Sequence, residues 1–563
     1  MNISVLKLKN KNSFRIINAS DGENTIGGFY ISGLNCRRIK TVIIIFLCVM
    51  LLLAARVGYI QIICHDDLTE AAVSQHEIAI EGLDTRGMIF DRNLQPLTGG
   101  TKQYYYIVSK KREDAAFEKI IKKIEGQQVA KETSAYHVYR TEKYNDDINN
   151  ILKKEYGSYV FESQSRYADD QMACHLVGYL NQDENKGVSG LELIHQQQLK
   201  DDGDVLTVLA DGAGNIIKGI APSINADFTS EKTMQARSVI TSIDRRLQYV
   251  CEKSLAKAGD GGAAVVMDTD TGEILAWASS PKFNPNDIAS YLDEQGDCLI
   301  DKVCQGTYAP GSVFKIVTAI AALENNVCDE TQVFECSGQV TIEGVTLKCT
   351  AAEEGHGSVD MSQAMAVSCN CYFAQLGEMV GCDEIVKTAA KLGLGEKVLN
   401  NFPSEAEGNI PSEDQVWPYD ITNISIGQGA ILVTPLQVAK MTAIIASGGK
   451  DVTPVLYPDE KSEPANRLIS ESTAEKIDVM LRQVMIDGSG AGGDLWPASV
   501  HGKTGTAEAT WEGKDVKNCW FTGYFSVENK NYTMTVIVER GNSGAYTAMP
   551  VFKDVVDFLS ENP

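Results

Sequence analysis

The sequence predicts an α+β protein that one N-terminal helix attaches to a membrane. The apolar run 41–63 is long enough to cross a bilayer. Residues 263–278 hold two apolar stretches joined by a turn rich in Asp, Thr and Gly, which favours a β-hairpin. A buried helix is predicted to begin near Ser312, because Pro310 suits a helix start and an apolar stretch continues to Leu323.

Length and charge limit the possible classes of protein. The chain has 563 residues, of which 44% are apolar, so it can support more than one domain with a hydrophobic core. The net charge is −24, although residues 1–40 are basic. The rest of the chain is therefore strongly acidic, which argues against nucleic acid as a partner.

The run 41–63 is predicted to form a single transmembrane helix. Arg56 is the one charged residue of this run. Its side chain has to reach the membrane–water interface or pair with another group. A basic cluster at 37–40 precedes the run, and Asp66 and Asp67 follow it, which favours a cytoplasmic N-terminus with the bulk of the chain outside. A buried soluble helix and a cleaved signal peptide are the alternatives, but no small-residue cleavage site follows convincingly.

The fourteen cysteines have irregular spacing. Cys336 and Cys349 flank a predicted hairpin at 339–347 and are the best candidates for a disulfide, while free buried thiols are the alternative. Neither a CxxC pair nor a histidine cluster with the spacing of a zinc site is present. The sequence therefore predicts no metal and no cofactor.

The pattern of elements changes near residue 236. Residues 102–220 mix short strands with charged helices, such as 113–124 and 146–155. No reactive constellation is recognisable in this portion, so a spacer or docking domain is expected there. A strand at 239–243 and an amphipathic helix capped by Asp244 then follow. The predicted segments are a cytoplasmic tail (1–40), a transmembrane helix (41–63), a pedestal (64–235) and a larger domain (236–563).

A serine followed three residues later by a lysine is the first candidate for chemistry. This pattern occurs five times, starting at Ser4, Ser254, Ser279, Ser312 and Ser447. The other four copies lie before the membrane segment, on a solvated helix face, beside a proline or in a glycine loop. On a helix that begins near Ser312, the Ser312 hydroxyl and the Lys315 amine would be neighbours, and the serine would lie near the positive end of the helix dipole.

Two further motifs follow in a fixed order. They are Ser368-Cys369-Asn370 and Lys503-Thr504-Gly505-Thr506. An acyl-transfer site needs a nucleophile with a base, polar groups that carry the proton and orient an amide, and donors that bind a carboxylate. The serine–lysine pair, the SxN motif and the KTG motif could meet these three needs. Gly502 and Gly505 would let a substrate backbone lie against an edge strand. A surface SxN and a simple KTG turn are the alternatives.

The motifs resemble those of the class B (monofunctional) penicillin-binding proteins. The likeness covers roughly residues 41–563 and is strongest from 236 onward. Leu94 stands where the family has glycine, and Asp301-Lys302 stands where it tends to show Asn-Arg. The matching segments are Arg86–Asn93 (RGxIxDRN), Gly190–Glu192 (GLE), Tyr308–Lys315 (YxPGSxFK), His356-Gly357, Ser368–Asn370, Gly427–Gly429 and Lys503–Glu508.

The resemblance implies a fold. It predicts a penicillin-binding/β-lactamase-like transpeptidase domain with a five-stranded antiparallel sheet, covering helices and an all-helical lobe around 312–445. An elongated α+β pedestal would precede this domain. The expected strands are 263–267, 273–278, 499–506, 520–526 and 532–539.

The resemblance also implies a peptidoglycan D,D-transpeptidase. Ser312 would attack the carbonyl between the two terminal D-alanines of a stem peptide, with Lys315 as the base. Ser368 would pass the proton to the leaving amine, and Asn370 would hold the peptide amide. An amine of a second stem peptide would then take the acyl group and close a crosslink. A β-lactam would leave Ser312 acylated.

The KTG segment would bind the terminal carboxylate through Lys503, Thr504, Gly505 and Thr506. The backbone N–H groups of Ser312 and Thr506 would form the oxyanion hole. Burial beside Lys503 would lower the pKa of Lys315 and make it a better base.

Other functions remain open from the sequence. A D,D-carboxypeptidase or a β-lactamase would admit water to the same acyl-enzyme. A non-catalytic protein, either a β-lactam sensor or a scaffold, is an alternative outside the enzymes. A sensor would require a larger cytoplasmic domain. The pedestal favours a synthase.

The resemblance implies partners and a location. The partners are peptidoglycan stem peptides, β-lactam antibiotics, the bacterial cell membrane and, since no polymerase domain is recognisable, a polytopic peptidoglycan glycosyltransferase. The protein would act in cell-wall synthesis during cell-shape maintenance, division or sporulation. The acceptor amine is also left open.

Overall fold

The structure is a computed structural model that describes residues 36–64, 77–80, 86–129, 136–181, 186–200, 206–209, 223–224, 237–292, 297–460, 466–493 and 496–562. Most of the predicted tail, Ser4, Asp66 and Asp67 lie outside these residues. The chain divides into two compact units, residues 1–76 and 77–563.

The first unit contains helix α1 (Cys36–Ile62). Its segment Ile39–Ile62 has a mean hydropathy of 2.6 and is not buried. By length and composition, α1 is the one helix among the described residues that could cross a membrane. It includes nearly all of the predicted span at 41–63.

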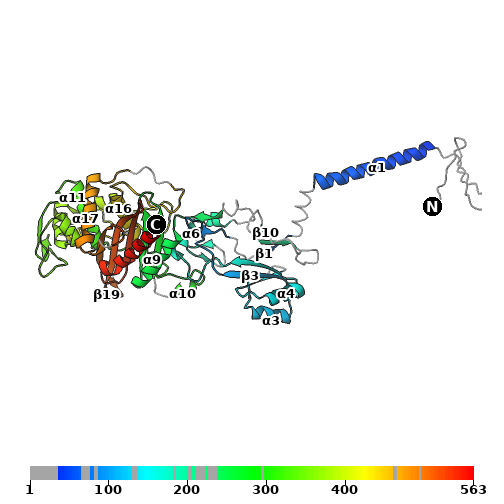
Figure 1. Cartoon of the computed structure of the whole chain (residues 1–563), viewed down its shortest axis with the longest axis horizontal. Coiled ribbons are helices and arrows are strands. Elements are labelled where there is room, and N and C mark those ends of the chain that lie inside the picture. Colours follow the sequence, from blue (N-terminus) through cyan, green and yellow to red (C-terminus); the bar gives the residue numbers. More distant parts are fainter. Residues whose placement is uncertain are drawn as a thin grey trace, which may run out of the picture. The chain divides into compact units, whose positions relative to one another are not determined.

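The pedestal is built around a four-stranded antiparallel sheet. Apolar residues of two helices pack on one face of it, and Asp114 and Asn145 cap these helices by accepting backbone N–H bonds (Figure 1). The strand order is β4 (Gln127–Gln128), β5 (Tyr136–Thr141), β3 (Lys102–Ser109) and β6 (Tyr159–Gln164), and the helices are α3 (Ala115–Lys123) and α4 (Asp146–Glu155). The helices predicted at 113–124 and 146–155 are thus confirmed.

Shorter elements complete the pedestal. The GLE segment begins the first of two short helices, α6 (Gly190–Ile194) and α7 (Gln196–Leu199). The remaining elements are β1 (Glu77–Ile80), β9 (Leu206–Leu209) and β10 (Ser223–Ile224) in one sheet, the pair β7 (Leu180–Asn181) and β8 (Lys186–Gly187), η1 (Lys110–Arg112) and α5 (Cys174–Val177).

Two motifs that are far apart in the sequence contact each other inside the pedestal. Arg86, from the RGxIxDRN segment, pairs with the fully buried Glu192 of the GLE segment, and Arg166 donates to the same carboxylate at 2.7 Å. These hydrogen bonds offset the free-energy cost of burying the Glu192 carboxylate away from water. These family motifs are therefore structural in this chain.

The RGxIxDRN segment also contacts the larger domain. Strand β2 (Ile89–Phe90) pairs in parallel with β11 (Val239–Ile240). The Asp91 carboxylate accepts the backbone N–H of Arg245 at 3.2 Å, at the start of the next helix. Leu94, the departure from the family glycine, has a φ of +59°, a conformation that glycine adopts without strain.

The larger domain contains the predicted five-stranded antiparallel sheet. Its order is β13 (Ile274–Ser280), β12 (Gly262–Asp268), β20 (Lys530–Val538), β19 (Lys514–Val527) and β18 (His501–Trp511). Alternate residues of β12 face opposite sides, so Ala264 and Val266 pack with α9 (Arg245–Ala258) and α18 (Met549–Glu561). Ala263 and Val265 face a second core, which contains α11 (Lys315–Glu324) and α16 (Pro435–Ala446).

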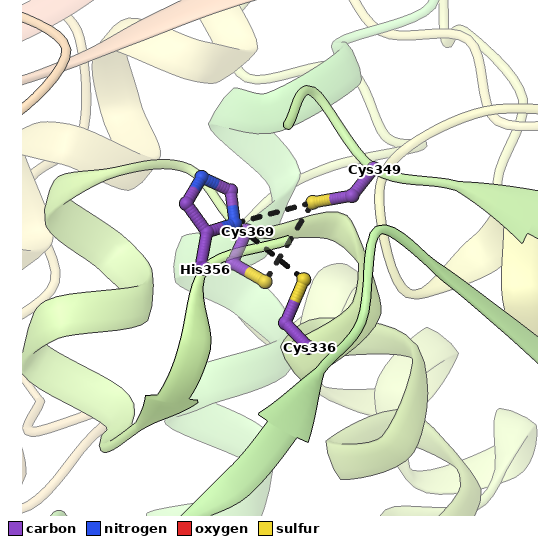
Figure 2. Close-up of side chains that lie close together, drawn as sticks. All are labelled: Cys336, Cys349, His356 and Cys369. Carbon is purple, nitrogen blue, oxygen red and sulfur yellow. Dashed lines mark hydrogen bonds between the residues drawn. The ribbon is translucent and has the colours of Figure 1, made fainter. Parts of the chain in front are cut away.

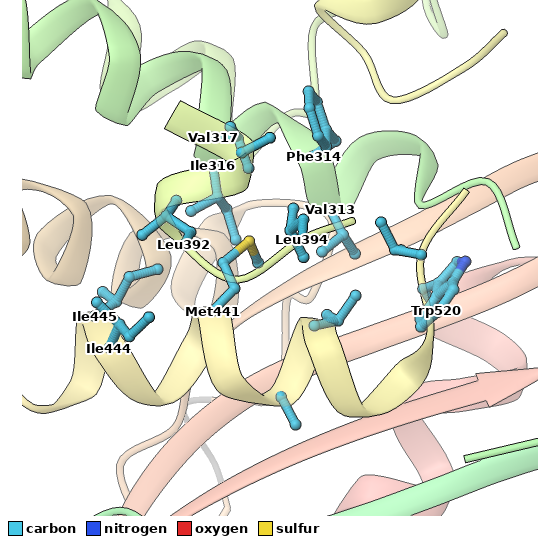
Figure 3. Close-up of a cluster of buried hydrophobic side chains, with 14 of the residues drawn as sticks. Val313, Phe314, Ile316, Val317, Leu392, Leu394, Met441, Ile444, Ile445 and Trp520 are labelled. Carbon is cyan, nitrogen blue, oxygen red and sulfur yellow. The ribbon is translucent and has the colours of Figure 1, made fainter. Parts of the chain in front are cut away.

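The second core holds the residues around the start of helix α11. Val313 and Phe314 lie with Ile316 and Val317 of α11 (Lys315–Glu324), opposite Met441 of α16 (Pro435–Ala446), in the cluster of Figure 3. Thr434 caps α16 in a reciprocal capping box with Gln437. This apolar packing fixes the turn that precedes α11.

The lobe expected to be all-helical is mostly helical but also carries short strands. They are β14 (Phe334–Cys336), paired with β17 (Gly357–Val359), and the hairpin β15 (Gln339–Ile342) with β16 (Val345–Lys348), which was predicted at 339–347. The helices are α11, α12 (Met361–Ala366), α13 (Asn370–Val380), α14 (Cys382–Lys391), α15 (Ile421–Ile424), α16 and α17 (Glu471–Asp487), with η3 (Glu413–Gln415) and η4 (Pro418–Asp420). Helix α10 (Ala289–Leu292) precedes the lobe.

Candidate active site

Ser312 lies in a short 3₁₀ turn, η2 (Gly311–Phe314), and the α-helix begins only at Lys315. The prediction of a buried helix that begins near Ser312 is therefore confirmed, with a first turn of 3₁₀ type. Gly311 has a φ of +53°, and a Cβ atom there would lie 2.8 Å from the carbonyl oxygen of Thr506. A close approach of strand β18 to the turn thus requires glycine.

Lys315 is completely buried beneath this turn. Its ammonium donates to the carbonyl oxygen of Ser368 at 2.7 Å, to Ser368 Oγ at 3.1 Å and to Asn370 Oδ1 at 2.7 Å. Among the described hydrogen bonds, none joins Lys315 to the Ser312 hydroxyl. Burial lowers the pKa of Lys315 to about 8, and the charge of nearby cysteine sulfurs partly opposes this shift.

The SxN motif forms the turn between α12 and α13. Ser368 has a φ of +56°, a left-handed conformation that costs a non-glycine residue roughly 1–3 kcal/mol. The Cys369 sulfur caps α13 by accepting the backbone N–H of Tyr372 at 3.4 Å. The Asn370 amide donates to the carbonyl oxygen of Lys348, at the end of the β15–β16 hairpin, at 3.1 Å. The turn is held by side chains rather than by a continuous sheet.

The KTG motif lies on the edge strand β18, as predicted. Lys503 is completely buried, and its ammonium donates to the carbonyl oxygen of Thr504 at 3.0 Å. Burial, followed by the charge of Lys315, holds the pKa of Lys503 well below its usual value. The Thr506 hydroxyl accepts the backbone N–H of Gly544 at 3.3 Å, from the π-helix η6 (Gly544–Ala548).

Close packing requires glycine at two positions of this strand, and Gly505 also lines a cavity beside Ser312, so the expectation that the glycines make room for a substrate backbone stays a prediction. A Cβ atom on Gly502 would lie 2.7 Å from the Phe521 ring, and one on Gly505 would lie 2.9 Å from Val313. The absence of side chains lets the strand pack closely on its neighbours, including the turn that carries Ser312.

The three motifs meet at one cavity of about 690 Å³. The predicted residues that line it are Ser312, Ser368, Asn370, Thr504, Gly505 and Thr506. Lys315 and Lys503 lie behind this surface, fully buried, so their charges act from beneath the cavity wall. An acyl group on Ser312 would be surrounded by hydroxyls, an amide and two buried amines, which suits acyl transfer.

Sequence reasoning missed Ser489. Its hydroxyl lies 2.6 Å from Thr504 Oγ1, and its backbone N–H donates to the carbonyl oxygen of Ala366 at 2.8 Å. It therefore links the KTG strand to helix α12, which leads into the SxN turn. It lies in a glycine-rich loop, where no motif marks it.

Sequence reasoning also missed a cluster of potential metal ligands beside the SxN turn. The side-chain donor atoms of Cys336, Cys349, His356 and Cys369 all lie within 4.8 Å of one another. Cys336 and Cys349, the candidate disulfide pair, are free thiols here. Spacing along the chain gives no sign of the cluster, because the four residues come from separate segments that only the fold brings together.

Comparison with known proteins agrees with the geometry. Residues 262–557 match the family model of the penicillin-binding protein transpeptidase domain. The chain is 28% identical to the peptidoglycan D,D-transpeptidase MrdA of Acinetobacter baumannii over 91% of this chain and 86% of the relative. It is 27% identical to the stage V sporulation protein D of Bacillus subtilis over 93% and 86% of the respective chains.

A solved structure has the same fold over most of the chain. It comes from work on the structural coordination of polymerisation and crosslinking by a peptidoglycan synthase complex. The TM-score is 0.68 at 22% identity, and the match covers 93% of this chain and 99% of the other. The two-part architecture of pedestal and sheet domain is therefore a shared fold.

Proposed function

Because the chain belongs to the penicillin-binding protein transpeptidase family, we propose that it crosslinks peptidoglycan stem peptides through an acyl-enzyme on Ser312. The carrying observation is the single cavity that joins Ser312, the SxN turn and the KTG strand. Curated relatives are peptidoglycan D,D-transpeptidases by name, which supports the same chemistry. β-Lactams would acylate Ser312 in place of the terminal dipeptide.

Lys315 is the base in this proposal. A pKa of about 8 leaves a sizeable neutral fraction near neutral pH, which a base needs. The Ser312 proton reaches Lys315 when substrate binding aligns the turn, since hydrogen bonds at catalytic sites often tighten only in the complex. Ser368, which already accepts a hydrogen bond from Lys315, passes the proton to the leaving D-alanine amine.

The KTG strand binds the substrate carboxylate. Thr504 and Thr506 present hydroxyls to the cavity, and the Lys503 amine lies behind them. A bound carboxylate would restore the charge on Lys503, because an opposite charge favours the protonated amine. The Asn370 amide orients the peptide, and the backbone N–H groups of Ser312 and Thr506 stabilise the oxyanion.

The protein acts at the membrane in this proposal. The apolar helix α1 and the family together fit a single-pass membrane protein. We propose that its N-terminus is cytoplasmic, because the residues at 37–40 are basic. A polytopic glycosyltransferase is the proposed partner, since one structural neighbour comes from a peptidoglycan synthase complex. Co-purification from membranes tests this pairing.

Covalent labelling tests the nucleophile. We expect Ser312→Ala to abolish labelling by a fluorescent penicillin while circular dichroism stays unchanged. Ser254→Ala is the matched control, because it removes the serine of another SxxK copy and should leave labelling intact. Persistent labelling of a folded Ser312→Ala protein would exclude Ser312 as the nucleophile.

Product analysis tests the fate of the acyl group. Purified protein is incubated with polymerised lipid II, and the muropeptides are separated by mass. Crosslinked dimers are the expected product. Stem peptides that are only shortened by one alanine would instead identify a D,D-carboxypeptidase.

A further inference from the structure

We propose that Glu508 and Lys517 bind the side chain of the stem-peptide residue that precedes the two terminal D-alanines, and that this side chain carries an ammonium and a carboxylate on one carbon. Such a residue is a diaminodicarboxylic acid. Lysine, whose side chain ends in an amine alone, fits the pair less well. This assignment rests on the proposed transpeptidase function and names the class of stem peptide that the cavity takes.

The order of groups along β18 sets the direction of the bound stem peptide. In the proposed function, the terminal carboxylate binds at Lys503 and Thr504, and the carbonyl that Ser312 attacks lies against the backbone N–H of Thr506. Strand β18 is an edge strand, and an extended peptide can pair with such an edge. Because both chains advance by about 3.3 Å per residue, the part of the stem that precedes this carbonyl runs on towards Glu508.

Glu508 and Lys517 form a cross-strand pair of opposite charge. The register of β18 with β19 places them directly opposite each other, where Cβ atoms on one face of a sheet are about 4.5–5.5 Å apart. Both side chains are exposed, and both residues line the cavity that contains Ser312. Among the ion pairs and hydrogen bonds of the described residues, none engages either charged group. Both charges are therefore available to a ligand.

The rest of the cavity offers no second acidic group. Among the described residues that line it, Glu508 is the one acid, and the remaining charged residue, Lys348, ends the β15–β16 hairpin at the SxN wall. The thiol–imidazole cluster of Figure 2 lies beside the SxN turn, but none of its labelled residues lines the cavity. An ammonium group on the substrate therefore has one acidic partner in the cavity.

The substrate supplies that ammonium group. A crosslink ends on an amine of a second stem peptide, and the donor and acceptor are copies of the same stem, so the donor carries this amine too. A bare side-chain amine would bind Glu508 but would face the like charge of Lys517. An ammonium and a carboxylate on one carbon match both charges. Exposed ion pairs are individually weak, so the expected preference is about 10-fold.

A purely structural pair is the competing interpretation. Opposite charges on facing positions of two strands stabilise a sheet without any ligand. That interpretation predicts no discrimination between stem peptides, so the ratio of two substrate rates separates the two interpretations.

Exchange of the terminal D-alanine measures this ratio with one constant acceptor. Polymerised lipid II that carries either diaminopimelate or lysine before the two D-alanines is incubated with the full-length protein and a labelled D-amino acid. D-Alanine leaves, and the labelled amine takes the acyl group from Ser312. We expect exchange about 10-fold faster with the diaminopimelate polymer. Equal exchange would overturn the assignment and leave the proposed function intact. Absence of both exchange and crosslinks with either polymer would overturn the proposed function and, with it, the assignment.

A charge reversal tests the pair itself. Lys517→Glu should bring the ratio of the two exchange rates to about 1 or below, because two carboxylates favour the bare amine. Lys514→Glu is the matched control, since Lys514 is exposed on the same strand but does not line the cavity, and it should keep the wild-type ratio. An unchanged ratio in Lys517→Glu would overturn the assignment.

A β-lactam probe removes the dependence on polymer substrates. A penicillin with an α-aminoadipyl side chain presents an ammonium and a carboxylate on one carbon, whereas the phenylacetyl side chain of penicillin G is uncharged. The acylation rate of the first relative to the second, followed by intact-protein mass spectrometry, should fall about 5- to 10-fold in Lys517→Glu and stay unchanged in Lys514→Glu. The same relative rate in wild type and Lys517→Glu would overturn the assignment.

Discussion

The two walls of the active-site cavity are held in different ways. The KTG wall is an eleven-residue strand paired along its whole length with β19 in one sheet. The SxN wall is a turn with a left-handed serine, held by short strand pairs and a thiol–imidazole cluster. A backbone ladder fixes the first wall wherever the sheet forms. The second depends on individual side chains, so we expect it to be more sensitive to local substitutions.

The largest expected effect comes from the residue that joins the two walls. Lys315 is anchored at the turn that contacts β18, and its ammonium binds the SxN turn. Lys315→Met should lower penicillin acylation by about 10³-fold or more, since the proposed base and the anchor of Ser368 are both lost. Stopped-flow measurement of acylation with a chromogenic cephalosporin checks this. A loss below about 10-fold would contradict the role of Lys315 as base.

The pH dependence of acylation is the next largest effect. Only the neutral form of Lys315 accepts a proton, and its pKa is lowered to about 8. The acylation rate at saturating β-lactam should therefore rise by roughly 50-fold between about pH 6 and 8 and level off above. Saturation matters because the bound carboxylate keeps Lys503 charged. A rate that is flat over this range would argue against a neutral lysine base.

A pair of glycine substitutions compares the walls directly. Gly311→Ala places a Cβ atom 2.8 Å from the Thr506 carbonyl oxygen, whereas Gly344→Ala, in the β15–β16 turn, meets nothing within 4 Å. Both glycines have positive φ, so the backbone strain of alanine is shared. Only Gly311→Ala should slow acylation, by about 10-fold, because the strand must move away from Ser312. Equal rates for the two variants would show that the close approach is unimportant.

Removal of one helix cap beside each wall tests whether the SxN wall is more sensitive to local substitutions than the KTG wall. Asp360 caps α12, which leads into the SxN turn, and Ser470 caps α17, which packs beside β18. Each change to alanine should lower the free energy of unfolding by about 1 kcal/mol in chemical denaturation. Only Asp360→Ala should also slow acylation, by about 2- to 3-fold, because no sheet restrains the turn that follows. A similar slowing in Ser470→Ala would remove the distinction between the walls.

The sequence predicts the KTG wall better than the SxN wall. The resemblance to the family places a strand at 499–506, and the structure has the edge strand β18 there. The order of the three motifs selects Ser312 among five SxxK copies. Both inferences use only the order of residues along the chain, so neither requires the tertiary structure.

What the sequence misses depends on tertiary packing. The 3₁₀ turn at Ser312 and the full burial of Lys315 and Lys503 follow from the contact of η2 with β18. The hydrogen bond between Ser489 and Thr504 joins a loop to a strand. The cysteine–histidine cluster is spread from 336 to 369, and neighbouring spacing gives no sign of it.

The strand order also has a consequence for biosynthesis. Strand β12 pairs with its neighbour β13 as a local hairpin, but its other edge pairs with β20, and the contact between Thr269 and Thr533 spans 264 residues. While the chain is being synthesised, the β12–β13 hairpin can form early, yet its second edge stays open until the last strands emerge. We therefore expect this edge to be the segment most in need of a chaperone during folding, and late completion of the sheet to limit the folding rate.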